Sequence, residues 1–391
     1  MTSTPGLKNL VLLGLGHAHV QVLRGLAHSR PADLNLTVIA PRPLAVYSGM
    51  VPGFVAGHYT AEQCRIPLDA LLARSGARTI AGSAIGIDAE TRTVSLASGE
   101  AVPWDWLSVN TGPIMDRDLL EVRMPGARRH ALFVRPIDAF VQLWPQVAEM
   151  AASRPIHLAV VGAGAAGVEL AMAASHALQG SGMPQGSHVS LVTGGEPPAA
   201  IYPQAVQARV QRALRRLNVT LIPETCVGVE VGALLLANGA RLVCDAPVLA
   251  VGTQAPAWLA DSGLALDEAG YLAVNAFQQS TSHPRVFAAG DVTSRVDAPH
   301  PRNGVHAVRA GVPLLANLRR DAGASFEALY AAPAHAEPAG LRLALRHRRL
   351  GSVQLRGPLG VALERPHRPR LRRPLRNLKP CPPLIPPKPQ P

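Results

Sequence analysis

Residues 160–171 read VVGAGAAGVELA, an apolar run that leads into the glycine spacing G-x-G-x-x-G. The first glycine of such a motif permits a tight strand-to-helix turn, the second lets a pyrophosphate approach the backbone, and the third lets helix and strand pack closely. The phosphates then lie at a helix N-terminus, where free N–H groups favour an anion. Because a predicted strand precedes the motif and a predicted helix follows it, we prefer this interpretation to a glycine-rich packing turn. The predicted contacts are Gly162, Gly164, Ala166 and Gly167.

A related turn occurs near the N-terminus, where residues 14–19 read GLGHAH. The first two glycines match, but His19 occupies the position of the third. Its larger side chain predicts either a displaced helix or an imidazole beside the phosphates. A metal site on the two histidines is the less favoured alternative, because no Cys, Asp or Glu follows at ligand spacing. The predicted backbone or phosphate contacts are Gly14, Gly16, His17, Ala18 and His19.

Short β-branched runs alternate with Ala- and Leu-rich helical stretches through most of the chain, which predicts an α/β fold with parallel sheets. Strands are expected at residues 10–13, 36–40, 158–161 and 188–193, and each successive pair flanks a helical stretch. The β-α-β unit that results occurs twice along the chain. Each copy contains one of the two glycine turns at the end of its first strand.

A third motif, TSHPRVFAAGDV, spans residues 281–292. Its apolar strand ends in small residues that permit close approach, Gly290 among them, and in Asp291, whose carboxylate can accept hydrogen bonds from a polyol. The alternative is a strand followed by an Asp-led turn. The next segment, RNGVHAVRAGVPLLANL, has the apolar spacing of a helix that begins near Asn303 or Gly304. We expect the N-terminus of that helix to point back toward Asp291.

The composition limits the class of protein. Hydrophobic residues make up 48% of the 391-residue chain and charged residues 16%, so a large core is available and disorder of the whole chain is excluded. At roughly 100–200 residues per domain, two or three domains fit. The four cysteines show no paired spacing, which favours a reducing compartment and excludes a secreted disulfide scaffold. The N-terminal segment is a poor signal peptide, and the glycine-containing run at 156–174 is a poor membrane span.

The formal charge of +12 comes almost entirely from the last part of the sequence. Residues 331–391 contain 13 Lys or Arg, two acidic residues and 13 of the 36 prolines. Proline at this density cannot continue helices or central strands. We therefore expect an electrically neutral body that has no nucleic-acid partner, followed by an irregular, basic tail.

The order of these motifs resembles the flavoproteins with two dinucleotide-binding domains in the pyridine nucleotide-disulfide oxidoreductase superfamily. The resemblance covers residues 8 to about 330 and includes a final helix that closes on Asn317. Within the superfamily, the chain is most similar to the type II NADH dehydrogenase-like branch, which also occurs fused to selenophosphate synthetase. That closer likeness is carried by HAHVQVL, VYSGMVPGFVAGHYT, VRPID and GVHAVRAG.

The resemblance implies two Rossmann-like domains, one for FAD and one for NAD(P)H, with the second inserted in the first. The implied FAD-binding domain comprises residues 1–140 and 261–330. The implied NAD(P)H-binding domain is 141–260, and 331–391 is the basic Pro/Arg-rich tail. Both cofactors are implied by the family and not by composition or spacing.

The resemblance also assigns roles to the motifs. The first glycine turn would hold the FAD pyrophosphate, and Asp291 would bind the ribityl chain. The helix from Gly304, with Val305 in its first turn, would aim its positive end at the flavin pyrimidine edge. The second glycine turn would hold NAD(P)H. Gly112 in LSVNTG and Gly252 in LAVGT match the strands that cross between the domains.

Some positions depart from the family pattern. The acid that usually ends the second strand of each unit and binds an adenosine ribose is missing from VIAPRP at 38–43 and from LVTGGE at 191–196. Arg42 is a candidate for an adenine or phosphate contact instead. Thr193 takes the other place, which leaves the choice between NADH and NADPH open. No C-x-x-C or C-x-x-x-x-C is present, so electrons must leave the flavin directly.

The resemblance thus predicts an FAD-dependent NAD(P)H dehydrogenase that passes hydride from nicotinamide C4 to flavin N5 and then reduces a quinone-like or other small acceptor. Glu169 and His306 are the predicted catalytic residues, Glu169 as the group that orients the nicotinamide end. Tyr47, Met50 and His306 are candidates for the flavin or acceptor surface. The alternatives are an acidic residue favoured at a helix start for Glu169 and ordinary packing for the other three.

Two rival functions stay open. A sulfide:quinone oxidoreductase needs catalytic cysteines near the flavin, and only Cys64 follows a loop of the first domain. A nucleotide-binding partner protein in selenium metabolism, with little turnover, is the non-enzymatic rival. The expected location is the cytoplasm, with peripheral contact at the inner face of the membrane as an open alternative. The oligomeric state is not predicted.

The tail allows a further expectation, that residues from about 330 onward are translated in the wrong frame. Codons exist for residues 361–376 that encode WRWNGPIDRAFVARY when read one base later, and this stretch resembles the C-terminal part of the relatives. The rival is a genuine, disordered, proline-rich basic tail that attracts anionic lipid or nucleic acid. Resequencing the gene near codon 330 distinguishes the two.

Overall fold

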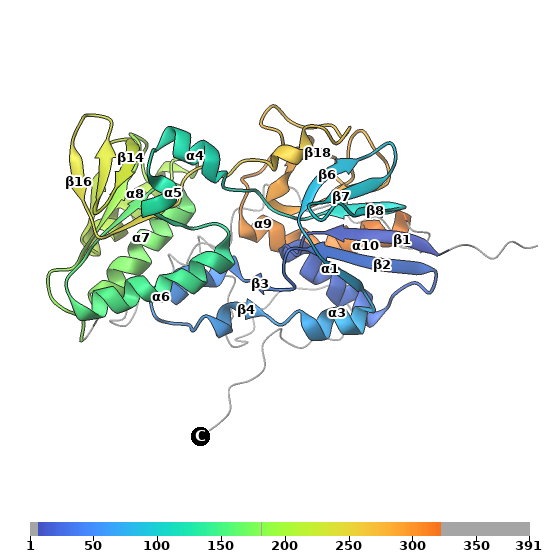
Figure 1. Ribbon diagram of the computed structural model, residues 1–391, viewed down its shortest axis with the longest axis horizontal. Helices are drawn as coiled ribbons and strands as arrows, with labels where there is room; N and C mark the ends of the chain where they lie inside the picture. The colour runs from blue at the N-terminus through green and yellow to red at the C-terminus, as the bar shows by residue number, and fades with distance from the viewer. Residues whose placement is uncertain (1–6, 181, 322–391) are drawn as a thin grey trace, which may run out of the picture. The chain divides into compact units, whose positions relative to one another are not determined.

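Two parallel β-sheets organise the protein, and the chain leaves the first sheet to build the second before it returns (Figure 1). The computed structural model describes residues 7–180 and 182–321, which belong to one structural unit. The predicted tail at 331–391, with its expected frame error, lies outside the described residues. The predicted α/β class is confirmed.

The first sheet has the strand order β19-β9-β1-β2-β5, and every pairing in it is parallel. Its strands are β1 (Lys8–Leu13), β2 (Leu34–Ala40), β5 (Arg78–Ala81), β9 (Trp106–Val109) and β19 (Val286–Ala288). The predicted strands at 10–13 and 36–40 are therefore confirmed, each slightly longer than expected. Since β19 pairs beside β9, residues after 280 complete a sheet that residues before 110 begin.

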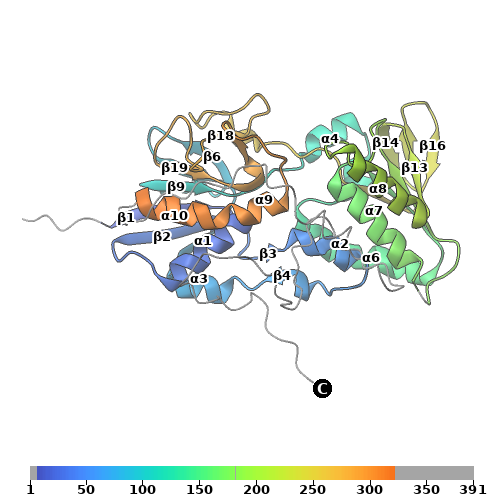
Figure 2. The same ribbon diagram turned by 180° about the vertical axis from the view of Figure 1, so that it is seen from behind.

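Both faces of the first sheet are buried, which explains the continuous apolar run of β1. Leu10 and Leu12 point to one face, and Val11 and Leu13 point to the other. The first face is covered by three helices, which Figure 2 shows side by side: α1 (His17–His28), α3 (Asp69–Ser75) and α10 (Gly311–Asp321).

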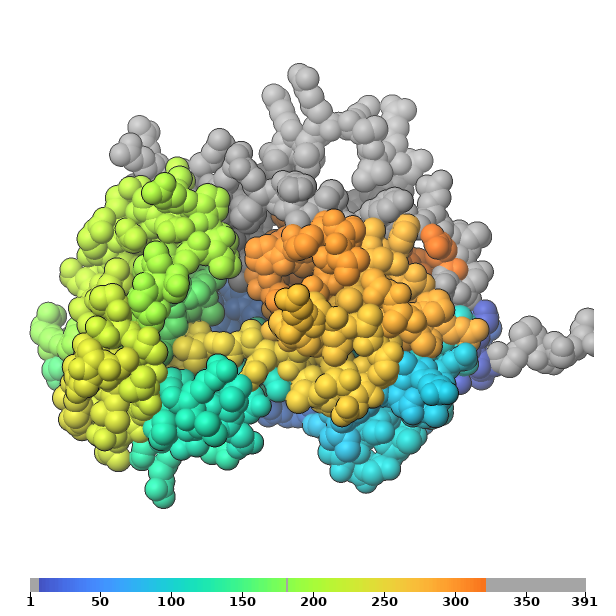
Figure 3. All heavy atoms as spheres, turned by 90° about the horizontal axis from the view of Figure 1, so that it is seen from above, coloured from blue at the N-terminus to red at the C-terminus, as the bar shows by residue number. Residues whose placement is uncertain are grey.

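The opposite face packs on a small antiparallel sheet and on residues after 255. These elements are β6 (Ala84–Asp88), β7 (Thr93–Leu96), β8 (Ala101–Pro103), η3 (Ala257–Leu259), β18 (Leu272–Val274) and β20 (Thr293–Arg295). Figure 3 shows the cyan β6–β8 region next to the gold segment that follows in sequence almost two hundred residues later. The two segments therefore form one layer of the FAD-type domain predicted from the sequence.

The second sheet repeats the same architecture with the strand order β10-β17-β11-β12-β13. Its strands are β10 (Leu132–Phe133), β11 (His157–Val161), β12 (His188–Val192), β13 (Val219–Ile222) and β17 (Ala246–Leu249). They confirm the predicted strands at 158–161 and 188–193. Leu158 and Val160 face one core and Ala159 and Val161 face another.

Helices cover one face of the second sheet and mostly short elements cover the other. The first group is α2 (Val51–Val55), α6 (Ile137–Ser153), α7 (Ala165–Leu178) and α8 (Gln204–Arg216). The second group is α4 (Arg117–Arg123), α5 (Ala127–His130), β14 (Cys226–Glu230), β15 (Ala233–Leu236) and β16 (Arg241–Val243). The remaining elements are β3 (Ala45–Val46), η1 (Ser48–Met50), η2 (Glu62–Cys64), β4 (Arg65–Ile66), η4 (Gly290–Val292) and α9 (Gly304–Arg309).

The sheet topology confirms two Rossmann-like domains with the second inserted in the first. The exact limits expected from the sequence, 1–140, 141–260 and 261–330, stay predictions. The helix expected near 303–317 begins where predicted but divides into α9 and α10.

Candidate dinucleotide sites

The second glycine turn joins β11 to α7, and its three glycines differ in what surrounds them. A side chain on Gly162, at φ 127°, would meet Ala250 O at 2.5 Å, and one on Gly167 would collide with Gly162 O. A side chain on Gly164 would meet nothing within 4 Å. Gly164 and Ala166 are exposed, and no side chain caps the first turn of α7. The outer glycines therefore close the turn, and the middle one leaves room for a phosphate.

The neighbouring strand ends supply the other residues expected at this site. Thr193 follows β12, is buried, and donates its backbone N–H to Ile222 O. Gly252 follows β17, and a side chain there would meet nothing within 4 Å. Because β11, β12 and β17 are parallel neighbours, their carboxyl ends meet at one edge of the sheet, which is where dinucleotides bind in such folds.

Glu169 lies one turn into α7, with its side chain buried. Its Oε1 has no hydrogen-bond partner among the described residues. Burial raises the pKa of this carboxyl to about 8, and the charge also contributes to a raised pKa at Tyr202, for which burial is the larger cause. A buried polar atom without a partner is uncommon and costs free energy. The group is chemically suited to exchange a hydrogen bond with a ligand at this turn.

The first glycine turn joins β1 to α1, and it is more crowded than the second. Side chains on Gly14 and Gly16 would both collide with Asn110. His17 begins α1, with its ring 5.3 Å from the Tyr47 ring and Nε2 3.4 Å from Ser48 Oγ. Burial, with a contribution from the Arg135 charge, lowers the pKa of His17 to about 4. A neutral imidazole therefore lies at the N-terminus of α1 at pH 7.

Met50, predicted to lie at the flavin or acceptor surface together with Tyr47, ends the short helix η1. Its side chain is buried, and its backbone N–H donates to Tyr47 O at 2.9 Å. The segment that contains both residues thus lies beside His17. Burial raises the pKa of the Tyr47 hydroxyl.

The first correction concerns His19, one of the residues expected to touch phosphate. Its side chain is completely buried, and its two ring nitrogens contact Gly14 O and Ser108 Oγ. Burial lowers its pKa to about 4. The imidazole has no free nitrogen for a phosphate, so the expectation of an imidazole beside the phosphates is wrong. Ala18, the neighbouring candidate, is also fully buried.

Arg42, the second departure from expectation, forms an ion pair with Asp138. The sequence suggested an adenine or phosphate contact for this side chain, which is about half exposed. Asp138 competes for the same guanidinium group. Gly112 lies two residues beyond Asn110, at φ 72°, with open space where a side chain would be.

Asp291 lies in η4, directly after β19, and its side chain is mostly buried. The Arg135 guanidinium approaches it, with 3.8 Å between Nη2 and Oδ2. Burial raises the pKa of Asp291, whereas the charges of Arg135, His300 and Arg302 oppose that shift. Because Arg135 also acts on His17, this cation connects the first glycine turn with the carboxylate. Arg135 was not a candidate from the sequence, where it appeared only inside VRPID.

Gly290 precedes Asp291 in the chain, and Val305 lies in α9, which packs against η4. Gly290 has φ 77°, and a side chain there would lie 2.8 Å from Asn110 Nδ2. Val305 is buried, and its N–H and that of His306 both donate to Asn303 Oδ1. Asn303 is thus the N-cap of α9. This cap already uses two of the N–H groups that were expected to point toward the flavin.

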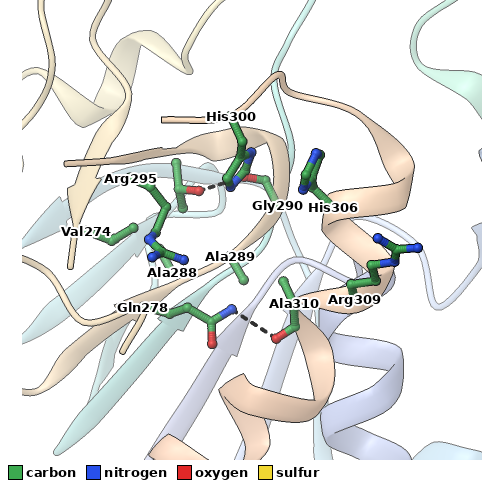
Figure 4. Close-up of a pocket in the computed structure, with 11 residues that line it drawn as sticks. Val274, Gln278, Ala288, Ala289, Gly290, Arg295, His300, His306, Arg309 and Ala310 are labelled. Carbon is green, nitrogen blue, oxygen red and sulfur yellow. Dashed lines mark hydrogen bonds between the residues drawn. The ribbon is translucent and has the colours of Figure 1, made fainter. Parts of the chain in front are cut away.

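His306, the second predicted catalytic residue, lines a pocket of about 40 Å³ beside β19 and α9 (Figure 4). Its ring stacks on His300 with centroids 4.3 Å apart. Burial and the neighbouring His300 and Arg309 charges lower its pKa to about 4. The pocket accommodates only one or two waters on the usual scale, so it is too small for a quinone ring.

The part of the chain that the structure describes contains no group of three or more His, Cys, Asp or Glu arranged to hold a metal ion. None of its helices is long and apolar enough to span a membrane.

Comparison with known proteins identifies the family. The model of the pyridine nucleotide-disulphide oxidoreductase family matches residues 8–311. An NADH dehydrogenase-like protein, MT1860 of Mycobacterium tuberculosis, is 28% identical over 250 residues, which are 61% of this chain and 60% of the relative. A sulfide-quinone reductase of Aquifex aeolicus is 30% identical over 106 residues, 27% of this chain and 24% of the relative. The chain thus spans about three fifths of the length of the first of these relatives.

Solved structures agree on the fold. The sulfide:quinone oxidoreductase of Aquifex aeolicus superposes with a TM-score of 0.67 at 19% identity, covering 81% of this chain and 77% of that one. A ferredoxin reductase of Rhodopseudomonas palustris gives 0.69 at 18%, covering 83% and 78%. FAD and NAD(P)H, the cofactors predicted from the sequence, are those of the matched family. The chain belongs to the pyridine nucleotide-disulphide oxidoreductase family.

Proposed function

We propose that the protein is an FAD-dependent NAD(P)H dehydrogenase that passes electrons to a quinone-like or other small acceptor. The names of two relatives, an NADH dehydrogenase-like protein and a sulfide-quinone reductase, support the donor and the acceptor class respectively. The selenium-metabolism alternative rests on the sequence resemblance alone.

The observation that carries the proposal is the contrast between the glycines of the second turn. The space beside Gly164 is open, whereas Gly162 and Gly167 are held tightly by backbone. An open middle glycine at an uncapped helix N-terminus is an arrangement that can accommodate a pyrophosphate. The Glu169 carboxyl on the same helix has an oxygen without a partner among the described residues, which supports its proposed role as a hydrogen-bond partner for a nicotinamide.

The first domain fits FAD through different groups. Asp291 offers a mostly buried carboxylate for the ribityl hydroxyls, and Arg135 offers a cation between that carboxylate and the first turn. The backbone of Gly14 and Gly16 would hold the pyrophosphate. FAD, when bound, supplies the acceptor for a hydride, while the protein positions the two nucleotides and tunes the charge around them.

The proposal requires electrons to leave the flavin without a protein disulfide. Cys64, Cys226 and Cys244 are free and buried. Burial raises the pKa of Cys64 to about 11, and a thiol of this kind is a poor nucleophile because it is not ionised at neutral pH. This observation favours a pyridine nucleotide over sulfide as the donor.

The decisive experiment is an anaerobic titration of the purified protein. We expect a yellow protein with a flavin spectrum that NADH or NADPH bleaches and a soluble quinone restores. NADH and NADPH are tested separately, because Thr193 leaves that choice open. A colourless protein that takes up no added FAD would refute the proposal, and so would a flavin that neither nucleotide reduces.

A further inference from the structure

The two glycine turns differ at their third position, and the structure gives the atoms involved. In the second turn, Gly167 packs directly against the carbonyl of Gly162, the first glycine of its motif. In the first turn, the equivalent carbonyl, Gly14 O, lies 2.6 Å from Nδ1 of His19. The imidazole therefore stands between helix and turn where the second domain has direct backbone contact.

The hydrogen bonds around His19 have one consistent direction. A carbonyl only accepts, so Nδ1 must carry the proton and donate to Gly14 O. His19 is neutral at pH 7 because burial lowers its pKa to about 4, which makes Nε2 an acceptor. Ser108 Oγ, 2.8 Å away, must then donate its proton to Nε2. Ser108 is itself fully buried on β9.

Asn110 connects the first glycine turn to the carboxyl end of β19 by hydrogen bonds. Its Oδ1 accepts from the His19 backbone N–H at 3.1 Å, and its Nδ2 donates to Ala289 O at 2.5 Å. Its own carbonyl accepts from Gly16 N–H at 3.1 Å. Asn110 thus fastens the first turn to the segment that leads into Asp291.

We propose that His19, Ser108 and Asn110 form a buried positioning unit that replaces the third glycine and sets the shape of the FAD phosphate turn. The inference rests on the proposed function, because it takes the first turn as the FAD site. The three side chains touch no ligand themselves. They fix Gly14, Gly16 and the Ala289 carbonyl relative to one another, so a change in the unit alters FAD binding without removing any FAD contact.

The test is the dissociation constant of FAD for the apoprotein of the full chain, measured by quenching of flavin fluorescence. Ser108→Ala leaves Nε2 of His19 buried without a donor. We expect FAD to bind about tenfold more weakly, within the range for an unsatisfied buried group. Ser108→Thr, which keeps the hydroxyl, should restore binding to within about twofold of wild type.

The second domain contains a matched control. Ser190 Oγ lies 2.8 Å from Nε2 of His157, the same pair at the same distance, and His157 begins β11, five residues before Gly162. Ser190→Ala should lower the melting temperature and leave the FAD dissociation constant unchanged. If Ser108→Ala does not fold, His19→Gln, which cannot reach both Gly14 O and Ser108 Oγ, takes its place with the same expected loss.

The outcomes separate this inference from the proposed function. A wild-type apoprotein that binds no FAD overturns the proposed function and this inference with it. A wild-type protein that binds FAD, together with a Ser108→Ala protein that melts lower but binds FAD equally well, overturns only the positioning unit. Equal weakening by Ser190→Ala also overturns it, because the loss would then not be local.

Discussion

Asp291 provides the carboxylate of the candidate flavin site, beside the Arg135 guanidinium group. Replacing it with alanine removes a charged acceptor from the proposed ribityl site, where such hydrogen bonds contribute on the order of 1.5–3 kcal/mol. We expect Asp291→Ala to weaken FAD binding about ten- to a hundredfold. The readout is the flavin that stays bound through gel filtration and dilution.

The control for that change is Asp297→Ala, which also removes an aspartate that pairs with an arginine, Arg295, from the same region. Asp297 is half exposed and lies outside the proposed site. Full flavin retention by Asp291→Ala would remove this residue from the site.

His19 also makes the stability of the protein depend on pH. Its pKa is about 4 in the folded protein against 6.5 for an unperturbed histidine, so the unfolded chain binds the proton more readily. The free energy of unfolding is therefore highest above pH 6.5, where His19 is neutral in both states. It falls by roughly 3 kcal/mol as the pH drops toward 4, because protonation of His19 then favours the unfolded chain. Denaturant titrations between pH 7.5 and 4 should show a shallower pH slope for His19→Gln than for wild type. Equal slopes would contradict this assignment.

At the scale of single residues, the motifs indicated candidate positions, and the roles of these positions in binding stay predictions. Asp291 and the glycines were proposed as candidates from their motifs. The places of Ser108 and Asn110 were not, because His19 meets Ser108 across 89 residues and Asn110 meets Ala289 across 179. Arg135 was missed for the same reason, since a single sequence contains no record of such long-range partners.

Among the elements, the turn between β11 and α7 offers the sharpest test. Gly164 has φ −67° and open space around it, so the fold accepts a larger side chain there. A valine would occupy the proposed pyrophosphate position. We expect Gly164→Val to keep its flavin and to lose reduction of that flavin by NADH and NADPH. The measurement is flavin content followed by anaerobic bleaching.

Gly162→Val is the contrasting variant, because its side chain would collide with backbone at Ala250. We expect it to fold poorly and to lower the yield of protein. If Gly164→Val loses flavin but is otherwise folded, the assignment of the two turns to their cofactors is reversed.

The division of the predicted C-terminal helix into α9 and α10 could not be predicted from the spacing of apolar residues. The apolar spacing of residues 302–318 predicts one helix, and the buried positions do continue from α9 into α10. The break falls after Arg309. Pro313 has no N–H to donate to the Arg309 carbonyl, so the helix cannot run through with its bonds intact. The spacing of the apolar residues stays the same on both sides of the break. The hydrophobic pattern alone therefore does not predict where α9 ends and α10 begins.

For the molecule as a whole, the identity of the electron donor to the flavin can be tested directly. Because Cys64 is buried with a raised pKa, we expect sulfide to leave the flavin oxidised under conditions in which NADH or NADPH bleaches it. Cys64→Ser should leave that bleaching unchanged, within twofold in rate. Rapid bleaching by sulfide that Cys64→Ser abolishes would favour the sulfide:quinone oxidoreductase alternative.

The two-domain architecture was predictable because each β-α-β unit has a local sequence pattern, a short apolar strand followed by a glycine turn. The insertion of one domain in the other was expected only from the family resemblance, and it is confirmed by the pairing of β19 with β9. The roles of the small antiparallel sheets were not predicted, since short alternating strands such as β6 to β8 give weak patterns.

That insertion has a consequence for the order of events during synthesis. Asn110 and its partner Ala289 are 179 residues apart, so at 5–20 residues per second the ribosome needs roughly 9–36 s to pass from one to the other. Throughout this interval the first sheet lacks its edge strand β19 and the carboxylate of Asp291. The strands of the second sheet, by contrast, all lie between β10 and β17, and α2, which packs on that sheet, is synthesised earlier, so this domain can fold as soon as β17 emerges. In the proposed assignment, flavin is captured only after Asp291 has been synthesised, when the second sheet already has all its strands.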